Sequence, residues 1–177
     1  MSVYVFIATS LDGFIATSDG GVEWLDEIPN PDHSDFGYAE FMTGIDALVM
    51  GRNTFEKVLT FGGWPYDKPV FVLSNTLSGV PVEVEGKAEI VRVAPRTLVE
   101  SLAQRGVENL YVDGGRVIQS FLEDDLIDEM TITQVPVLLG NGLPLFGRLT
   151  KRLQFNHVRT ETFDNNLVQS TYSRVRG

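Results

Sequence analysis

The stretch Ala47-Leu48-Val49-Met50-Gly51-Arg52-Asn53-Thr54-Phe55 (residues 47–55) joins an apolar run to a polar segment through one glycine. Four consecutive apolar residues are typical of a strand that is buried on both faces, as the central strands of α/β sheets are. Residues 52–59 then carry apolar side chains at helical spacing. The pattern predicts a buried strand that leads directly into a helix.

This strand-then-helix pattern recurs along the first two thirds of the chain. Strands are predicted at residues 3–8, 47–50, 70–73, 89–93 and 110–112, with 89–93 nearer an edge because its polarity alternates. Helices are predicted at residues 35–43, 52–59, 96–105 and 116–122. Such alternation is typical of an α/β fold with a mostly parallel central sheet that helices flank.

The last third of the chain has a different pattern. Residues 129–138, 153–163 and 167–175 are predicted as strands, and Asp164-Asn165-Asn166 between the last two is typical of a hairpin turn. We therefore expect an antiparallel C-terminal hairpin on the parallel sheet. The length of 177 residues and the absence of a linker predict a single domain over residues 1–177.

Composition excludes several classes of protein. The net charge of −10 argues against nucleic-acid and anionic-membrane partners, and no apolar run approaches the roughly 20 residues of a membrane span. The chain has no cysteine, which excludes disulfides and thiolate chemistry and agrees with a cytoplasmic location. His33 and His157 are isolated, so no metal site is expected.

Two strand-to-helix junctions carry glycines that would suit an anionic ligand. At Gly51-Arg52-Asn53-Thr54, the helix N–H groups and dipole favour a phosphate, although a plain turn capped by Thr54 is the alternative. At Gly114-Gly115-Arg116-Val117, adjacent glycines leave room for a ligand, although a flexible turn is the alternative. Two such junctions in one sheet fit a dinucleotide, but the Rossmann fingerprint G-x-G-x-x-G is absent.

Three further positions allow both a structural and a functional interpretation. Ser74-Asn75, after the strand at 70–73, is neutral and polar, which favours NADP over NAD, or it is an ordinary turn. Asp35 begins a predicted helix, either as its cap or as an acid that gives a proton to a ring nitrogen. Trp24 is either a core aromatic residue or part of a pocket wall.

Taken together, these segments resemble the dihydrofolate reductase superfamily. The nearest similarity is to the branch that contains the riboflavin-biosynthesis reductase domain and its stand-alone relatives. The resemblance covers nearly the whole chain through segments in the family's order, which are residues 8–16, 50–56, 70–75, 112–118, 128–137 and 140–146.

The resemblance implies an NADPH-dependent reductase that transfers a hydride to a small heterocyclic ring of the pyrimidine, pterin or flavin-like type. An activity like that of 5-amino-6-(5-phosphoribosylamino)uracil reductase is included. The implied cofactor residues are Ala8 and Ile15 at the nicotinamide, Gly51, Arg52, Asn53 and Thr54 at the phosphates, Ser74 and Asn75 at the 2′-phosphate, and Gly114, Gly115, Arg116 and Val117 at the pyrophosphate.

The resemblance also implies a substrate site at Trp24, Asp35 and Thr133, with Asp35 as the catalytic carboxylate. A partly buried carboxylate beside a threonine would hydrogen-bond an amino-pyrimidine edge and have a raised pKa. The chain departs from folate reductases in the long acidic segment 25–34 and in Asp113, where those enzymes usually have glycine. These departures rank dihydrofolate below another ring as the substrate.

Other functions remain open from the sequence. One is dihydrofolate reductase proper, another is a catalytically silent NADP-binding sensor module, and a third is an interaction protein that keeps only the fold. A homodimer is expected, because the C-terminal strands present an edge that must be covered or paired, and because the riboflavin-reductase relatives associate.

Overall fold

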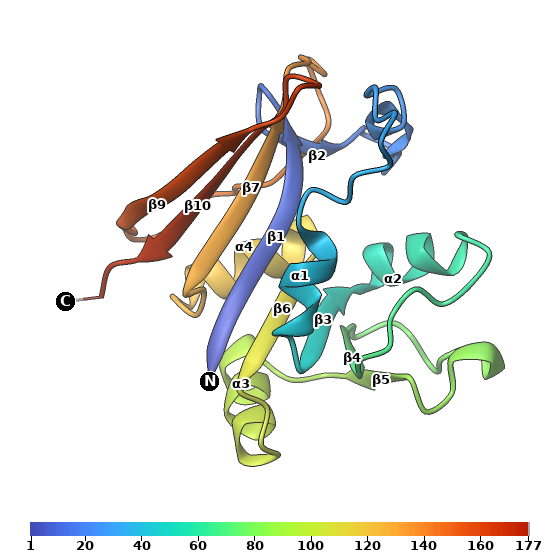
Figure 1. Cartoon of the computed structure of the whole chain (residues 1–177). Coiled ribbons are helices and arrows are strands. Elements are labelled where there is room, and N and C mark those ends of the chain that lie inside the picture. Colours follow the sequence, from blue (N-terminus) through green and yellow to red (C-terminus); the bar gives the residue numbers. More distant parts are fainter. Residues whose placement is uncertain (177) are drawn as a thin grey trace.

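The computed structural model describes residues 1–176 and places eight strands in one sheet with the order β5-β4-β3-β6-β1-β7-β10-β9 (Figure 1). The strands of this sheet are β1 (Ser2–Ser10), β3 (Ala47–Gly51), β4 (Val70–Leu73), β5 (Ala88–Val91), β6 (Asn109–Asp113), β7 (Glu129–Val135), β9 (Phe155–Thr162) and β10 (Val168–Arg174). The helices are η1 (Glu23–Leu25), α1 (Tyr38–Thr43), α2 (Arg52–Leu59), η2 (Val82–Val84), α3 (Pro95–Gln104) and α4 (Gly115–Glu123).

The strand directions confirm the predicted architecture. β1 pairs in parallel with β6 and β7, and β3 pairs in parallel with β4 and β6. β5 lies at the edge beside β4, as its alternating sequence predicts. β10 runs antiparallel to both β7 and β9. The sheet is therefore mostly parallel, with an antiparallel hairpin at its C-terminal side.

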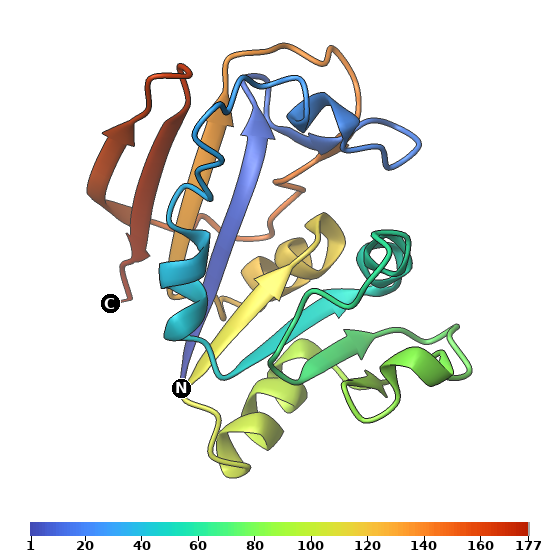
Figure 2. The ribbon, with the colours of Figure 1, turned by 45° about the vertical axis from the view of Figure 1, so that its right-hand side comes forward.

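Helices cover the two faces of the parallel part of the sheet. Side chains of α3 and α4, such as Leu102 and Phe121, pack on Val5 and Val112 in one core layer. On the other face, Phe55 of α2 joins Met50 and Val72 in a second layer, against which α1 packs. Figure 2 shows α1 and α4 on opposite sides of β1. The uninterrupted apolar strands are explained by this burial on both faces.

Two predicted boundaries differ from the structure by three residues each, and one small sheet was missed. The helix predicted at 35–43 begins only at Tyr38, because Phe36 and Gly37 both adopt positive φ angles, of 53° and 85°, that a right-handed helix excludes. The strand predicted to reach residue 138 ends at Val135, before Pro136. A small antiparallel sheet of β2 (Phe14–Ala16) and β8 (Leu143–Pro144) was not predicted at all.

The C-terminal hairpin agrees with its predicted turn chemistry. Asn166 in the turn has a φ of 67°, a left-handed conformation that asparagine tolerates, and its N–H donates to the Phe163 carbonyl over 2.9 Å. The N–H of Phe163 in turn donates to the Leu167 carbonyl over 3.0 Å.

None of the helices within residues 1–176 is long and apolar enough to cross a membrane.

Candidate active site

A cavity of about 480 Å³ opens where β1, β3 and β6 end and where α2 and α4 begin. In parallel sheets the carboxyl ends of neighbouring strands meet at one edge, which is where ligands of α/β proteins bind. Nine of the predicted cofactor residues line this cavity; they are Ala8, Ile15, Gly51, Asn53, Thr54, Gly114, Gly115, Arg116 and Val117. The structure thus brings together residues from both glycine-bearing junctions.

The first turns of α2 and α4 both offer backbone donors at the cavity. Gly51 and Gly114 are the N-cap residues of these helices, and neither end has a side-chain N-cap hydrogen bond. The first N–H groups of a helix have no partner within the helix and carry its positive dipole end. The alternative in which Thr54 caps α2 does not occur, so two helix N-termini without a side-chain cap face one cavity.

Close packing explains why glycines occupy the second junction. Gly114 has a φ of 91°, and a Cβ there would lie 2.3 Å from the Thr54 Oγ1 atom. A Cβ on Gly115 would lie 2.8 Å from the Ile15 Cδ1 atom and 3.3 Å from the Pro144 carbonyl oxygen. Side chains at these positions would collide with Thr54 and Ile15, so glycine lets α4 begin in close contact with the first junction and with the small β2–β8 sheet.

The wall beside the start of α4 comes from the small β2–β8 sheet, which contributes Ile15, Ala16, Leu143 and Pro144 to the cavity. The side chain of Gln119 on α4 fixes this wall, because its Nε2 atom donates to the Pro144 carbonyl over 2.9 Å. The wall therefore joins two segments that are about 130 residues apart in sequence.

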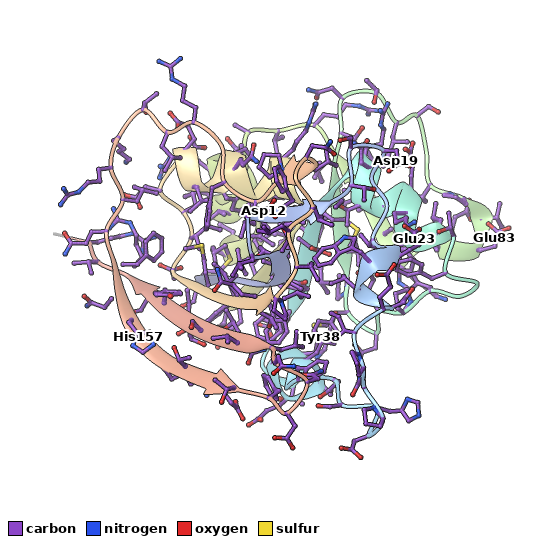
Figure 3. All side chains as sticks on the ribbon, turned by 90° about the horizontal axis from the view of Figure 1, so that it is seen from above. Asp12, Asp19, Glu23, Tyr38, Glu83 and His157 are labelled. Atoms are coloured by element: carbon purple, nitrogen blue, oxygen red, sulfur yellow. The ribbon has the colours of Figure 1, made fainter. Side chains whose placement is uncertain are left out.

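Asp12 ties the same two segments together from outside the cavity. Its Oδ1 atom accepts hydrogen bonds from the Ser10 hydroxyl over 2.6 Å and from the Leu139 N–H over 3.1 Å. Its Oδ2 atom accepts from the Gly140 N–H over 2.8 Å. These bonds, led by that from Ser10, lower the pKa of the Asp12 carboxyl. Seen from above, Glu23 and His157 on β9 lie on opposite sides of the molecule, with Asp12 between them (Figure 3).

The remaining predicted cofactor residues lie outside the cavity lining, on the ends of β3 and β4. The Arg52 Nη1 atom donates to the Thr76 Oγ1 atom over 3.2 Å, and the Thr76 N–H donates to the Ser74 Oγ atom over 3.2 Å. Asn75 stands between them in sequence and is exposed. Arg52 therefore lies with the residues predicted to hold the 2′-phosphate, and it does not line the cavity as Gly51, Asn53 and Thr54 do.

Asp113 is a cavity residue whose charge sequence reasoning did not use. It lies at the end of β6, half-buried in the cavity wall, and its Oδ1 atom accepts a hydrogen bond from the Gly114 N–H over 2.8 Å. Burial raises the pKa of the Asp113 carboxyl to about 6. The signal available in the sequence was an acidic residue between a buried strand and a glycine pair.

Two tyrosines share this environment. Tyr66 also lines the cavity, and burial followed by the nearby charge of Asp113 raises its pKa well above the ordinary value. The same two causes, in the same order, raise the pKa of Tyr38 to about 12. Both phenols therefore stay protonated at neutral pH and can act as hydrogen-bond donors.

A smaller cavity of about 220 Å³ adjoins the first, and Ala8 and Leu25 line both. Asp35 and Thr133, which were predicted to act together, both line this smaller cavity. The Thr133 Oγ1 atom accepts a hydrogen bond from the Gln169 Nε2 atom over 2.9 Å. Trp24 lines neither cavity; it is buried against Val135 and Leu167, as in its core interpretation.

The expected raised pKa of Asp35 is wrong. Its side chain is exposed, and its two oxygens accept hydrogen bonds from the Ala39 N–H over 2.8 Å and the Gly37 N–H over 3.0 Å. These bonds stabilise the ionised carboxylate and lower its pKa, with Ala39 as the larger contribution. The geometry of Asp35 is that of a residue capping the start of α1.

Comparison with known proteins places the chain in a family. The RibD C-terminal domain profile matches residues 68–169, which are more than half of the chain. The chain belongs to the RibD C-terminal domain family. This is a family of NAD(P)H-dependent reductases with a dihydrofolate-reductase-like fold.

Within residues 1–176, no group of three or more histidine, aspartate or glutamate side chains is placed to hold a metal ion.

Relatives of similar length include both unassigned proteins and solved structures. An uncharacterized Bacillus subtilis protein, YwjB, is 36% identical over 175 residues and 97% of each chain. A Shewanella sp. PV-4 structure, provisionally named a riboflavin biosynthesis protein, is 50% identical, has a TM-score of 0.95, and matches 99% of this chain and 100% of its own.

A third relative shares the fold at lower identity. It is the Thermotoga maritima diaminohydroxyphosphoribosylaminopyrimidine deaminase/5-amino-6-(5-phosphoribosylamino)uracil reductase, which is 19% identical with a TM-score of 0.75. The match covers 98% of this chain and 56% of that longer protein. At this identity the likeness concerns the fold alone.

Proposed function

We propose that this protein is an NADPH-dependent reductase that transfers a hydride to a small heterocyclic ring of the pyrimidine, pterin or flavin-like type. The observation that carries the proposal is the meeting of two uncapped helix ends, those of α2 and α4, in one cavity of about 480 Å³. A dinucleotide pyrophosphate needs N–H donors from more than one loop, and this cavity offers them.

The residues present fit NADPH along the length of the cavity. The glycine pair, which lines the cavity without a side chain, would let the pyrophosphate approach the first N–H groups of α4. Ala8 and Ile15 would flank the nicotinamide. Arg52, hydrogen-bonded to Thr76, would hold the 2′-phosphate together with the Ser74-Asn75 turn, which favours NADPH over NADH.

Bound NADPH would supply the hydride, which brings two electrons and one hydrogen to a carbon of the substrate. Reduction of a C=N bond also needs a proton at the nitrogen, and Asp113 is the cavity residue that we propose gives it. Its pKa of about 6 allows the carboxyl to hold a proton near neutral pH. The apolar β2–β8 wall, with Leu143 and Pro144, would exclude water from the reacting ring.

A matched pair of glycine variants tests the cofactor site. We expect NADPH to raise the melting temperature of the wild-type protein by several degrees, since saturation at a hundred times Kd stabilises by roughly 2.7 kcal/mol. NADH should raise it less. Gly115→Ala should abolish the shift through the clash with Ile15, whereas Gly79→Ala, which meets nothing within 4 Å, should keep it. No shift in the wild type with either cofactor would refute the proposal.

The role of Asp113 has its own measurement. Asp113→Asn keeps an acceptor for the Gly114 N–H but cannot give a proton, so NADPH binding should persist while substrate-dependent NADPH oxidation falls by about 10²-fold or more. Asp35→Asn should change the rate far less, because Asp35 already serves the Ala39 and Gly37 N–H groups. The reverse order of effects would return the catalytic role to Asp35.

A further inference from the structure

We infer that the substrate is a heterocycle without a phosphate or other anionic tail, and that Glu23 is a specificity-determining residue that keeps such tails out. This inference rests on the proposed function, because it describes the substrate end of the same site. It comes from the size and the walls of the smaller cavity, from the charges around it, and from an ion pair made by a lysine that lines the larger one.

The smaller cavity has room for a small ring and offers it mainly apolar contacts. Beyond Ala8 and Leu25, where the two cavities meet, its walls include Phe6, Ile28 and Phe36. The hydroxyl of Thr133 is already hydrogen-bonded to Gln169. A volume of about 220 Å³ with such walls suits a flat ring system held by packing.

The segment that forms the outer wall of this cavity carries charge of one sign. Residues 25–37 contain four acidic residues and neither lysine nor arginine; the acidic residues are Asp26, Glu27, Asp32 and Asp35. The hairpin turn beside it adds Asp164, because the neighbouring Asn165 Nδ2 atom donates to the Pro29 carbonyl over 3.1 Å. A phosphate at this mouth would meet like charges, which disfavour binding.

The larger cavity has two cations in its lining, Lys57 and Arg116, and they differ in position. Arg116 follows Gly115 in the first turn of α4, where the cofactor phosphates are proposed to bind. Lys57 is on the last turn of α2, away from that helix end. Lys57 is therefore the cation left for an anionic substrate group among the described lining residues.

Glu23 already engages that lysine. The Lys57 Nζ atom, on α2, donates to the Glu23 Oε1 atom, on η1, over 2.8 Å, which holds the Glu23 carboxylate beside a cation that lines the larger cavity. The hydrogen bond from Lys57 is the largest cause of the lowered pKa of Glu23, which keeps the carboxylate ionised. Since the pair is partly exposed, its strength is modest, and we assign the exclusion of phosphate to the charge of Glu23 itself.

Matched ligand pairs test the inference on protein loaded with NADP⁺, the binding of which is first measured separately. Three pairs share a ring and differ in an anionic tail. They are 5-amino-6-(5-phosphoribosylamino)uracil and its dephosphorylated form, FMN and riboflavin, and dihydrofolate and dihydropterin. In titration calorimetry, at least one ligand without the anionic tail should bind. Its dissociation constant should be roughly tenfold or more below that of its anionic partner.

Glu23→Gln and the control Asp26→Asn separate a specific role from a general loss of charge. Glu23→Gln should narrow the affinity ratio within the binding pair about fivefold, the scale of one unit charge at close range in water, because the Glu23 side chain is largely exposed. Asp26→Asn removes a charge three residues away from Glu23 and leaves the pair of Glu23 and Lys57 in place. It should therefore narrow the affinity ratio less than Glu23→Gln does.

Three results would overturn the inference: tighter binding of anionic members, binding by no tail-free member, or equal effects of the two variants. Failure of NADP⁺ to bind in the loading step would instead count against the proposed function, so the two failures are distinguishable.

Discussion

Replacing Asp113 by asparagine should stabilise the fold at neutral pH, because it removes a charge from the cavity wall. The pKa of the carboxyl is about 6 in the folded protein against 3.8 for an unperturbed aspartate. The folded state thus holds the proton more tightly, and wild-type stability falls as the pH rises from about 4 to about 6. At about 1.4 kcal/mol per pKa unit, the shift amounts to at most about 3 kcal/mol at pH 7.5, an upper bound because Asp113 is only half-buried.

Urea unfolding at pH 7.5 and pH 4 measures this effect. The stability gain of Asp113→Asn should be largest at pH 7.5 and shrink below about 1 kcal/mol at pH 4, where both side chains are largely neutral. Asp46→Asn is a control of opposite sign, because N–H groups of Asn109 and Glu108 bind the ionised Asp46 and lower its pKa. Equal or lower stability of Asp113→Asn at pH 7.5 would refute the reasoning.

Three further predictions concern the cofactor, the cavity wall and assembly. Arg52→Ala should weaken NADPH binding about tenfold, the scale of one charge-assisted hydrogen bond, and leave NADH binding unchanged in calorimetry. Asp12→Ala should speed amide hydrogen exchange at residues 139–145 and raise the KM for NADPH, because the bonds to Leu139 and Gly140 are lost; unchanged exchange would contradict it. The protein should be a homodimer by light scattering. Phe146 lines an apolar cavity of about 340 Å³ beside β7 and β10, and Phe146→Asp should reduce the measured mass to that of one chain.

The parts of the fold that were predictable from sequence are those fixed by burial over short stretches. The apolar run 47–50 is central because β4 and β6 pair on either side of it and helices cover both faces. The glycines at 51 and 114–115 predicted the position of the cavity, because glycine at the end of a strand indicates that another part of the chain or a ligand approaches the backbone closely. In both cases a few neighbouring residues carried the whole signal.

Features that depend on distant contacts were not predictable. The β2–β8 pair consists of three and two residues, and its hydrogen-bond partners come from opposite ends of the chain. The network of Asp12 depends on the same approach, because the Leu139 and Gly140 N–H groups must arrive from residues more than 120 positions away. No local periodicity reports such a contact.

The two carboxylates, Asp35 and Asp113, show why residue type alone did not point to the proton donor that we propose. Asp35 is exposed and accepts two backbone N–H bonds, so its charged form is stabilised. Asp113 accepts one such bond, and burial dominates, so its neutral form is favoured up to a pH of about 6. A general acid must carry its proton at the working pH, a condition that Asp113 approaches and Asp35 does not. On our proposal, the protonated atom of the substrate therefore lies beside the glycine pair at the end of β6, and the smaller cavity at Asp35 serves to hold the rest of the ring.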